Sequence, residues 1–262
     1  MAQDDRLRHA SSFGRAAVAY AEHRPDYAHA AVRWALESAP GRRVLDLGAG
    51  TGKLTASLVD AGADVVAVEP DPAMLAELRA GLPAVPALPG SAESIPLPDG
   101  SVDAVVAGHA LHWFDMGLAG AEICRVLAPG GILAGLWNVV DDRVAWVSGL
   151  ARVGGAAVLG ARDLLSSWRA TTASAHLPGQ GAAHFGLADQ AEFPHARVTA
   201  EALVGRIATH AGLLVLPDHE REARLGGIRA YVEGRSETAD GALVAPMLTG
   251  VLRTRRLDTP AP

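Results

Sequence analysis

The sequence predicts an α/β fold in which a doubly wound parallel sheet is covered by helices on both faces. The first observation is a set of five short apolar runs of strand length, at residues 43–47, 64–68, 84–88, 102–108 and 131–137. The second is that stretches with helical spacing of apolar residues lie between these runs, at 52–61, 71–80 and 117–127. Alternation of strand and helix is typical of parallel strands joined by helical crossovers.

A helical segment is expected before the first strand. Helical spacing of apolar residues extends over residues 11–39, with an interruption at Pro25 and an end at Pro40-Gly41. We therefore assign residues 1–40 to a separate N-terminal helical part of the chain.

The pattern changes after the fifth predicted strand. Residues 139–190 contain Gly- and Ala-rich stretches and a polar loop, and we interpret them as an insertion over the active-site face. Order then returns with a strand near 192–198, helices near 200–211 and 217–233, and a last strand near 242–255. These observations predict one domain over 1–262, with a core at 41–138, an insertion or cap at 139–190 and the C-terminal part of the sheet at 191–262.

Composition excludes several classes of protein. The chain has 262 residues and a formal net charge of −6, which disfavours a broad nucleic-acid surface. Arg253, Arg255 and Arg256 alternate in the last predicted strand, and we interpret them as a solvated sheet edge. No apolar run approaches the roughly 20 residues of a membrane helix. The N-terminus does not have the pattern of a signal sequence, and Cys124 is the single cysteine, so we expect a cytoplasmic protein without membrane contact.

The turn after the first strand predicts a ligand site. Asp46 lies near the end of this strand, and Gly48, Gly50 and Gly52 follow it at the start of a helix. Glycines allow a tight turn and a close approach of the backbone to a ligand. Amide groups at the start of the helix are expected to face that ligand, and Asp46 is expected to accept hydrogen bonds from it. Lys53 stands where dinucleotide-binding proteins have their third glycine, which argues against a pyrophosphate site.

A second acidic residue follows at the end of the next predicted strand. Residues 63–68 form an apolar run that ends at Glu69. A carboxylate at the tip of the second strand is placed to bind both hydroxyl groups of a ribose.

Together these residues resemble the class I S-adenosylmethionine-dependent methyltransferases, of the methyltransferase type 11-like group. The first motif and the ribose-binding acid of that family read like D-L-G-A-G-T-G at 46–52 and V-E-P-D at 68–71. The resemblance extends to residues 90–98, 109–114 and 125–133. The lead-in Y-A-E-H-R-P-D-Y at 20–27 is similar to that of a group that includes trans-aconitate methyltransferase-like proteins.

The resemblance implies a Rossmann-like seven-stranded sheet of order 3-2-1-4-5-7-6, ending in an antiparallel hairpin, with S-adenosylmethionine as cofactor. It implies cofactor contacts at the tips of the first three strands, by Asp46, Gly48, Ala49, Gly50, Glu69, Pro70, Met74, Ser91, Ala92 and Glu93. It further implies that the N-terminal helices close as a lid, with Tyr20 and Arg24 over the cofactor. The alternative is that these helices only pack against the sheet, with both residues at the surface. No metal is required.

Two histidines after the fourth strand are the candidate catalytic residues. The resemblance places His109 at the methionine end of the cofactor, where related proteins often have Gln. His109 is a possible general base as well as a cofactor contact, and His112 is a second polar candidate. A buried, hydrogen-bonded histidine is the alternative for His112, and Trp113 is expected to pack against the sheet.

The predicted function is methyl transfer to a small-molecule acceptor, by O-, N- or C-methylation. A carboxylate or a secondary metabolite is a possible acceptor, and Arg24 or Arg143 would hold a carboxylate. Trp137, Trp146 and Trp168 are possible lining residues of an apolar acceptor pocket, although tryptophan is more often a core residue. Two alternatives stay open: an NAD-dependent Rossmann oxidoreductase, and a non-catalytic S-adenosylmethionine-binding protein. The sequence does not indicate an oligomeric state.

Overall fold

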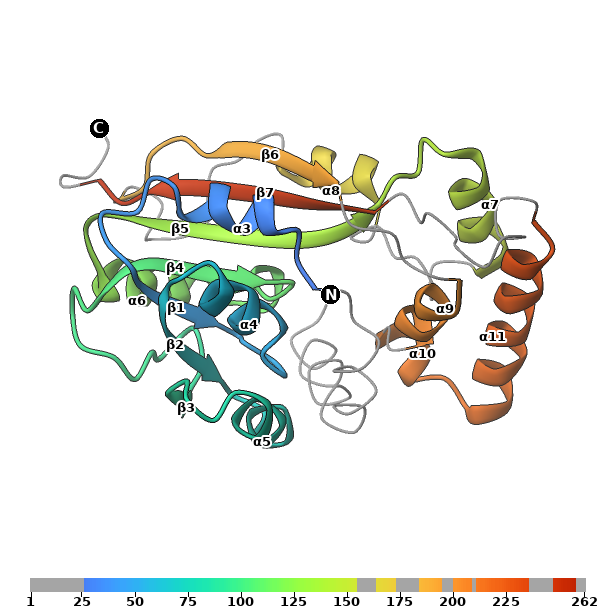
Figure 1. Cartoon of the computed structure of the whole chain (residues 1–262), viewed down its shortest axis with the longest axis horizontal. Helices are drawn as coiled ribbons and strands as arrows, with labels where there is room; N and C mark the ends of the chain where they lie inside the picture. Colours follow the sequence, from blue (N-terminus) through green and yellow to red (C-terminus); the bar gives the residue numbers. More distant parts are fainter. Residues whose placement is uncertain are drawn as a thin grey trace.

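The protein contains one seven-stranded sheet with helices on both faces (Figure 1). The computed structural model describes residues 26–154, 164–172, 184–194, 200–208, 211–235 and 247–257. The strands are β1 (Arg43–Leu47), β2 (Asp64–Glu69), β3 (Ala87–Pro89), β4 (Val102–Gly108), β5 (Leu127–Val140), β6 (Asp189–Pro194) and β7 (Met247–Arg255). Their order is β3-β2-β1-β4-β5-β7-β6, which confirms the predicted fold class and strand order.

The central strands are parallel because helical crossovers connect them. β1 pairs with β2 on one side and with β4 on the other, and β4 pairs in parallel with β5. β7 runs antiparallel to both β5 and β6. All residues of β1 after Arg43 are buried, Asp46 included, as expected for a strand covered on both faces.

Amphipathic helices cover the two faces. α3 (His29–Leu36) and α4 (Lys53–Asp60) pack their apolar residues against one face of β1, β4 and β5. On the other face, α6 (Met116–Val126) and α8 (Leu165–Thr172) join the second core cluster. α5 (Pro72–Gly81) packs Leu75 and Leu78 against Ala67 and Ala87 at the β2–β3 end. Asp71 caps α5 through its side chain, and Pro72 occupies the first helical position.

Several predicted boundaries differ from the observed ones. β3 begins at Ala87 instead of residue 84, because Val85 belongs to a turn in which its amide donates to Leu82. β5 is longer than the predicted 131–137 at both ends. β6 begins at Asp189, before the predicted 192, and β7 begins at Met247. The predicted segments 195–198 and 242–246 lie outside the described residues.

The chain between β5 and β7 builds a helical group beyond the end of β5 (Figure 1). Its helices are α7 (Ala145–Gly154), α9 (Ala200–Ala208), α10 (Ala211–Leu214) and α11 (Asp218–Glu233). They share an apolar cluster with Val140 at the end of β5 and Met247 at the start of β7. β6 and β7 are antiparallel neighbours, but α9, α10 and α11 lie between them in the chain, so they do not form a hairpin. The helical group contains residues from both the predicted insertion at 139–190 and the predicted C-terminal part at 191–262.

The prediction of a solvated edge at Arg253 is wrong. β7 lies between β5 and β6, and the Arg253 side chain is only 11% exposed. Its guanidinium carbon lies 3.9 Å from the ring centroid of Trp34 and a guanidinium nitrogen donates to the Trp34 carbonyl at 2.5 Å. Arg253 is thus a packing residue that joins α3 to the sheet.

The lead-in segment at residues 26–28 lies against the carboxyl ends of β4 and β5. Tyr27 is buried against Gly108, the last residue of β4: a Cβ atom at Gly108 would lie 2.5 Å from the Tyr27 hydroxyl oxygen. Glycine at this position allows the lead-in to approach the strand end. Among the described helices, none is both long enough and apolar enough to cross a bilayer.

Gly108→Ala tests this close contact. The new methyl group would displace the Tyr27 ring, so we expect the free energy of unfolding to fall by about 1–3 kcal/mol. Gly81→Ala is the matched control, because nothing lies within 4 Å of a Cβ atom there. Denaturant unfolding of both variants, repeated in a Tyr27→Ala background, measures the effect. An equal loss for Gly108→Ala with and without the tyrosine ring would contradict the packing argument.

Candidate functional site

The glycine turn after β1 adopts the conformation that the sequence predicts. Gly48, Gly50 and Gly52 have φ values of 70°, 58° and 89°, in the region that side chains disfavour. A Cβ atom at Gly48 would lie 2.7 Å from the Cβ atom of Ala110, just after β4. The turn therefore packs directly against the tip of β4, and a larger residue at position 48 has no room.

The first three amide groups of this turn donate hydrogen bonds within the protein. The Gly48 and Ala49 amides donate to the Val68 carbonyl at 2.9 and 3.1 Å, and the Gly50 amide donates to Glu69. These three amides, which precede the start of α4, are thus engaged within the protein. The glycines contribute space and backbone conformation at this place, and these three amides do not supply free donors.

Glu69 connects the ends of β1 and β2. Its Oε2 atom accepts from the Gly50 amide at 2.8 Å and its Oε1 atom accepts from the Asp71 amide at 2.8 Å. The residue is 7% exposed. Burial raises the pKa of the Glu69 carboxyl, while the two amide hydrogen bonds lower it. Each carboxylate oxygen keeps a second acceptor position, so Glu69 can fix the turn and still accept hydroxyl groups.

Asp46 is a fully buried acid beside Glu69. Its Oδ2 atom accepts from the Thr55 hydroxyl at 2.6 Å, and its Oδ1 atom has no hydrogen-bond partner among the described residues. The pKa of Asp46 is raised to about 7, because burial and the nearby Glu69 charge raise it by more than the Thr55 bond lowers it. A buried acceptor without a partner is costly, and a ligand donor would remove this cost.

Pro70 and Met74 lie beside this acid pair at different depths. Pro70 is exposed, whereas Met74 is buried at the start of α5. A Cβ atom at Gly50 would come within 3.8 Å of the Met74 sulfur. Met74 therefore packs under the glycine turn, and its place on the adenine side of a ligand stays a prediction.

The predicted adenine-edge residues lie in the loop after β3. Ala92 is buried in the core beneath α6, and Ser91 forms an isolated bridge with Ser94. Glu93 accepts from the Asp115 amide at 2.9 Å, at the start of α6. Glu93 thus fixes the N-terminus of α6, which is a structural role that the spacing of residues in the sequence did not reveal.

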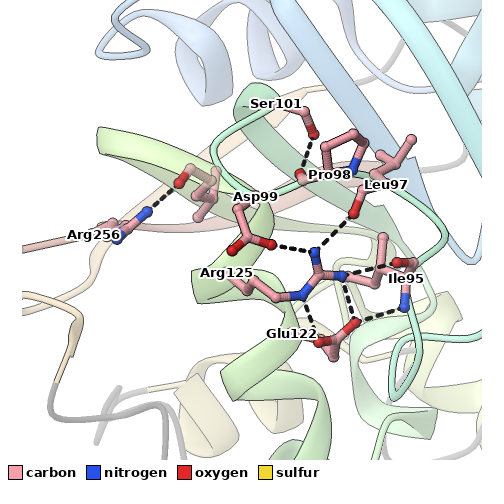
Figure 2. A network of polar contacts seen from close by, with 9 residues as sticks. Ile95, Leu97, Pro98, Asp99, Ser101, Glu122, Arg125 and Arg256 are labelled. Atoms are coloured by element: carbon pink, nitrogen blue, oxygen red, sulfur yellow. Dashed lines mark hydrogen bonds and ion pairs between the residues drawn. The ribbon is translucent and has the colours of Figure 1, made fainter.

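The Arg125 side chain on α6 joins the rest of this loop to the helix (Figure 2). Arg125 donates to both carboxylate oxygens of Glu122, to Asp99, and to the carbonyls of Leu97 and Ile95. The Ile95 amide donates back to Glu122 at 2.9 Å. The Arg125 guanidinium lowers the pKa of Glu122. This network fixes the position of the loop that carries Ala92.

His109 stands at the tip of β4 in a strained backbone conformation. Its φ of 52° is the one positive value found among the described non-glycine residues. The Asn138 amide donates to its Nε2 atom at 2.8 Å, and the His109 amide donates to the Leu136 carbonyl. Since Nε2 accepts, the neutral ring carries its proton on Nδ1. Strain of this kind is concentrated at functional sites.

His112 lies in a short 3₁₀ turn, η1 (Leu111–Trp113). The Trp137 indole nitrogen approaches its Nδ1 atom at 3.5 Å, and its ring lies 4.9 Å from that of Trp113. Both candidate histidines thus have a ring nitrogen that accepts from the protein.

Trp113 is half-buried, and Tyr20 and Arg24 lie outside the described residues.

Three residues of this region were missed by sequence reasoning: Tyr27, Asn138 and Thr249. Asn138 and Thr249 are buried polar residues, and they bond to each other. The Tyr27 ring centroid lies 6.3 Å from that of His109. The one signal in the sequence was a polar residue, Asn138, inside an apolar run. It could not reveal the contacts of Asn138, because Asp26 and Thr249 are more than 100 positions away in the sequence.

The acceptor side is less defined. Trp137, Trp146 and Trp168 are buried in the apolar clusters, in agreement with the core alternative. Arg143 pairs with Asp141 at 2.6 Å. Within the described ranges, no group of three or more His, Cys, Asp or Glu residues could hold a metal ion.

The buried state of Asp46 predicts a pH dependence of stability. An unfolded Asp has a pKa near 3.9, and burial raises the folded value to about 7. The folded state therefore keeps a proton that the unfolded state loses, and stability falls as pH rises from about 4 to about 7, by up to about 1.4 kcal/mol per pH unit.

Asp46→Asn removes this contribution while an amide oxygen can still accept from Thr55. The difference between wild-type and variant free energies of unfolding, measured from pH 4 to pH 8, isolates the Asp46 contribution. A difference that does not change over this range would contradict the assignment.

Comparison with known proteins identifies the family. The sequence profile described as "Methyltransferase domain" matches residues 45–135. A methyltransferase-like protein of Schizosaccharomyces pombe is 36% identical over 181 residues, which cover 68% of this chain and 68% of the relative. A Mycobacterium tuberculosis methyltransferase is 55% identical over 142 residues, or 54% of this chain. This chain spans 58% of the length of that mycobacterial relative.

Solved structures support the same conclusion. A protein named as a type II methyltransferase of Anaeromyxobacter dehalogenans has a TM-score of 0.58 and 26% identity, covering 89% of this chain and 97% of the other. The resemblance to the trans-aconitate methyltransferase-like group is a finer prediction that these relatives do not test. The profile match includes the glycine turn, Glu69 and the tips of β3 and β4. This chain belongs to the family of class I S-adenosylmethionine-dependent methyltransferases.

Proposed function

We propose that the protein binds S-adenosylmethionine at the carboxyl ends of β1 and β2 and transfers its methyl group to a small-molecule acceptor. One observation carries this proposal: Asp46 and Glu69 are two buried acids beside a glycine turn with positive φ values. Ligands of doubly wound folds bind at this edge of the sheet.

The residues present fit the cofactor. Glu69 would hold the two ribose hydroxyls with its remaining acceptor positions, and Asp46 would accept from the amino group with its unpartnered Oδ1 atom. Met74 and Ala92 would border the adenine, and Gly48 and Gly50 leave room for the ligand to approach the backbone. An ammonium group beside Asp46 would favour the ionised acid, in opposition to the effect of burial.

Bound S-adenosylmethionine supplies an electrophilic methyl group on a sulfonium. The protein then has to hold the acceptor in line with this group and exclude water. Alignment of this kind can supply on the order of 7–11 kcal/mol of the barrier. A base is needed only where the acceptor must lose a proton.

We assign His109 to positioning rather than to proton removal. Its Nε2 atom accepts from the Asn138 amide, so protonation at Nε2 would place two donors against each other. This role agrees with the Gln that often occupies the position in related proteins.

The acceptor class stays broad. A relative from Methylococcus capsulatus, 39% identical over 117 residues, is named malonyl-[acyl-carrier protein] O-methyltransferase. A relative from Beutenbergia cavernae, 43% identical over 100 residues, is named demethylmenaquinone methyltransferase. The two names differ in acceptor, so O-, N- and C-methylation all stay within the proposal, including methylation of a carboxylate. We also propose that the protein is cytoplasmic. Within the predicted lid at 1–40, α3 packs on the sheet, so we propose the closing role for the lead-in before α3.

Glu69→Ala tests the cofactor site. Loss of both carboxylate oxygens should weaken binding of S-adenosylhomocysteine at least tenfold, measured by titration calorimetry, because the ribose hydroxyls lose their acceptors. Glu69→Gln keeps one side-chain oxygen, so its affinity for S-adenosylhomocysteine should lie between those of the wild type and Glu69→Ala. Glu77→Ala on α5 is the control for loss of an acid outside the site, and it should bind as wild type does.

Calorimetry with NAD and a turnover assay separate the alternatives. Binding of NAD in preference to S-adenosylhomocysteine would indicate an oxidoreductase. Formation of S-adenosylhomocysteine with a panel of small acids, phenols and amines identifies an enzyme, and cofactor binding without turnover on any of them would favour the non-catalytic alternative.

His109→Gln tests the positioning role with an acceptor identified by that panel. Loss of a general base costs about 10²- to 10⁴-fold in rate. We expect kcat to fall less than tenfold, with the same shape of the pH–rate profile. His112→Gln is the parallel control, and a loss above 100-fold with a flattened acid limb in His109→Gln would identify a base.

A further inference from the structure

A closed ring of contacts joins the lead-in segment to the tips of β1, β4 and β5. Asn138 near the end of β5 donates from Nδ2 to the Asp26 carbonyl at 3.2 Å. The Asp26 carboxylate pairs with Lys53 at 3.2 Å, at the start of α4 directly after the glycine turn. The turn packs through Gly48 against Ala110, next to His109.

The ring closes at His109. The Asn138 amide donates to His109 Nε2 at 2.8 Å, so one residue bonds to the lead-in through its side chain and to the β4 tip through its backbone. The strained φ of His109 is held by this bond and by the bond of its own amide to Leu136. The ring therefore passes around the edge of the sheet where we place the cofactor.

Thr249 on β7 adds a second attachment of the lead-in. Its hydroxyl donates to Asn138 Oδ1 at 2.8 Å and accepts from the Ala28 amide at 3.1 Å. Asn138 is 2% exposed and Thr249 is fully buried. Loss of either side chain would leave buried polar partners unsatisfied.

The buried bonds, and not the ion pair, decide the strength of the ring. The Asp26 side chain is 75% exposed, and such surface pairs contribute little and are screened by salt. The bond between Thr249 and Asn138 is buried, where a missing partner is costly, and the bonds to Asp26 and Ala28 are partly buried.

We propose that Asn138 and Thr249 are positioning residues that hold the lead-in over the cofactor and thereby control how fast the cofactor dissociates. The inference rests on the proposed function. Neither residue has to touch the cofactor: they fix residues 26–28 and the β4 tip as one unit. On this proposal, the lead-in has to leave this unit before the cofactor can dissociate.

Thr249→Val is the central test, because it removes the hydroxyl and keeps the shape. We expect the dissociation rate of S-adenosylhomocysteine to rise at least tenfold, or 1.4 kcal/mol, in stopped-flow measurements, with a small change in the association rate. Asn138→Ala should give the same change. Hydrogen exchange should show that the Ala28 amide loses its protection in Thr249→Val, because the hydroxyl that accepts from it is gone.

Two controls separate positioning from loss of stability. Thr249→Ser keeps the hydroxyl and should stay within twofold of wild type. Thr254→Val removes another buried β7 hydroxyl, which donates to Gly186 at 2.7 Å away from the ring, and should leave the dissociation rate unchanged.

An equal dissociation rate in Thr249→Val and Thr254→Val, or a wild-type dissociation rate in Asn138→Ala, would overturn the inference. Wild-type protein that does not bind S-adenosylhomocysteine would instead overturn the proposed function, so the two failures are distinguishable.

Discussion

Two carboxyl groups buried at the ends of adjacent strands are the constraint on which the site depends. Asp46 and Glu69 lie within a core of apolar strands, and burial raises the pKa of both. Glu69 offsets this cost by accepting two backbone amides, which fix the glycine turn in its positive-φ conformation. Asp46 offsets only part of it, through Thr55. The remaining acceptor capacity is what a cationic, hydroxyl-bearing ligand can use.

The surrounding structure holds these acids in a fixed geometry. The apolar residues of β1 and β2 leave little freedom at the strand ends, and packed interiors transmit small displacements. Arg125 fixes the loop after β3, and Ala110 limits the glycine turn from the side of β4. Because the acids cannot move apart to lower their mutual repulsion, a cationic ligand bound beside them would favour their ionised forms.

The sequence predicted the parts whose causes are local. Strand order followed from the family resemblance, and the turn at Gly48 and the acid at 69 from residues next to one another. The use of the Gly48 and Ala49 amides could not be predicted, because their acceptor is the Val68 carbonyl of the neighbouring strand. The roles of Glu93 and Arg253 likewise depend on Asp115 and Trp34, whose proximity only the folded chain creates.

The same distinction between local and distant partners separates the two halves of the site. The donor half is formed by neighbouring strand tips within one short stretch of sequence, so a motif describes it. The acceptor half that we propose would be bordered by the lead-in, the end of β5 and the helical group, where bonds such as those of Asn138 join residues more than 100 positions apart. Segments held by such contacts can change while the acids and the glycine turn stay the same. A common donor half with different acceptors is therefore the expected consequence of this architecture.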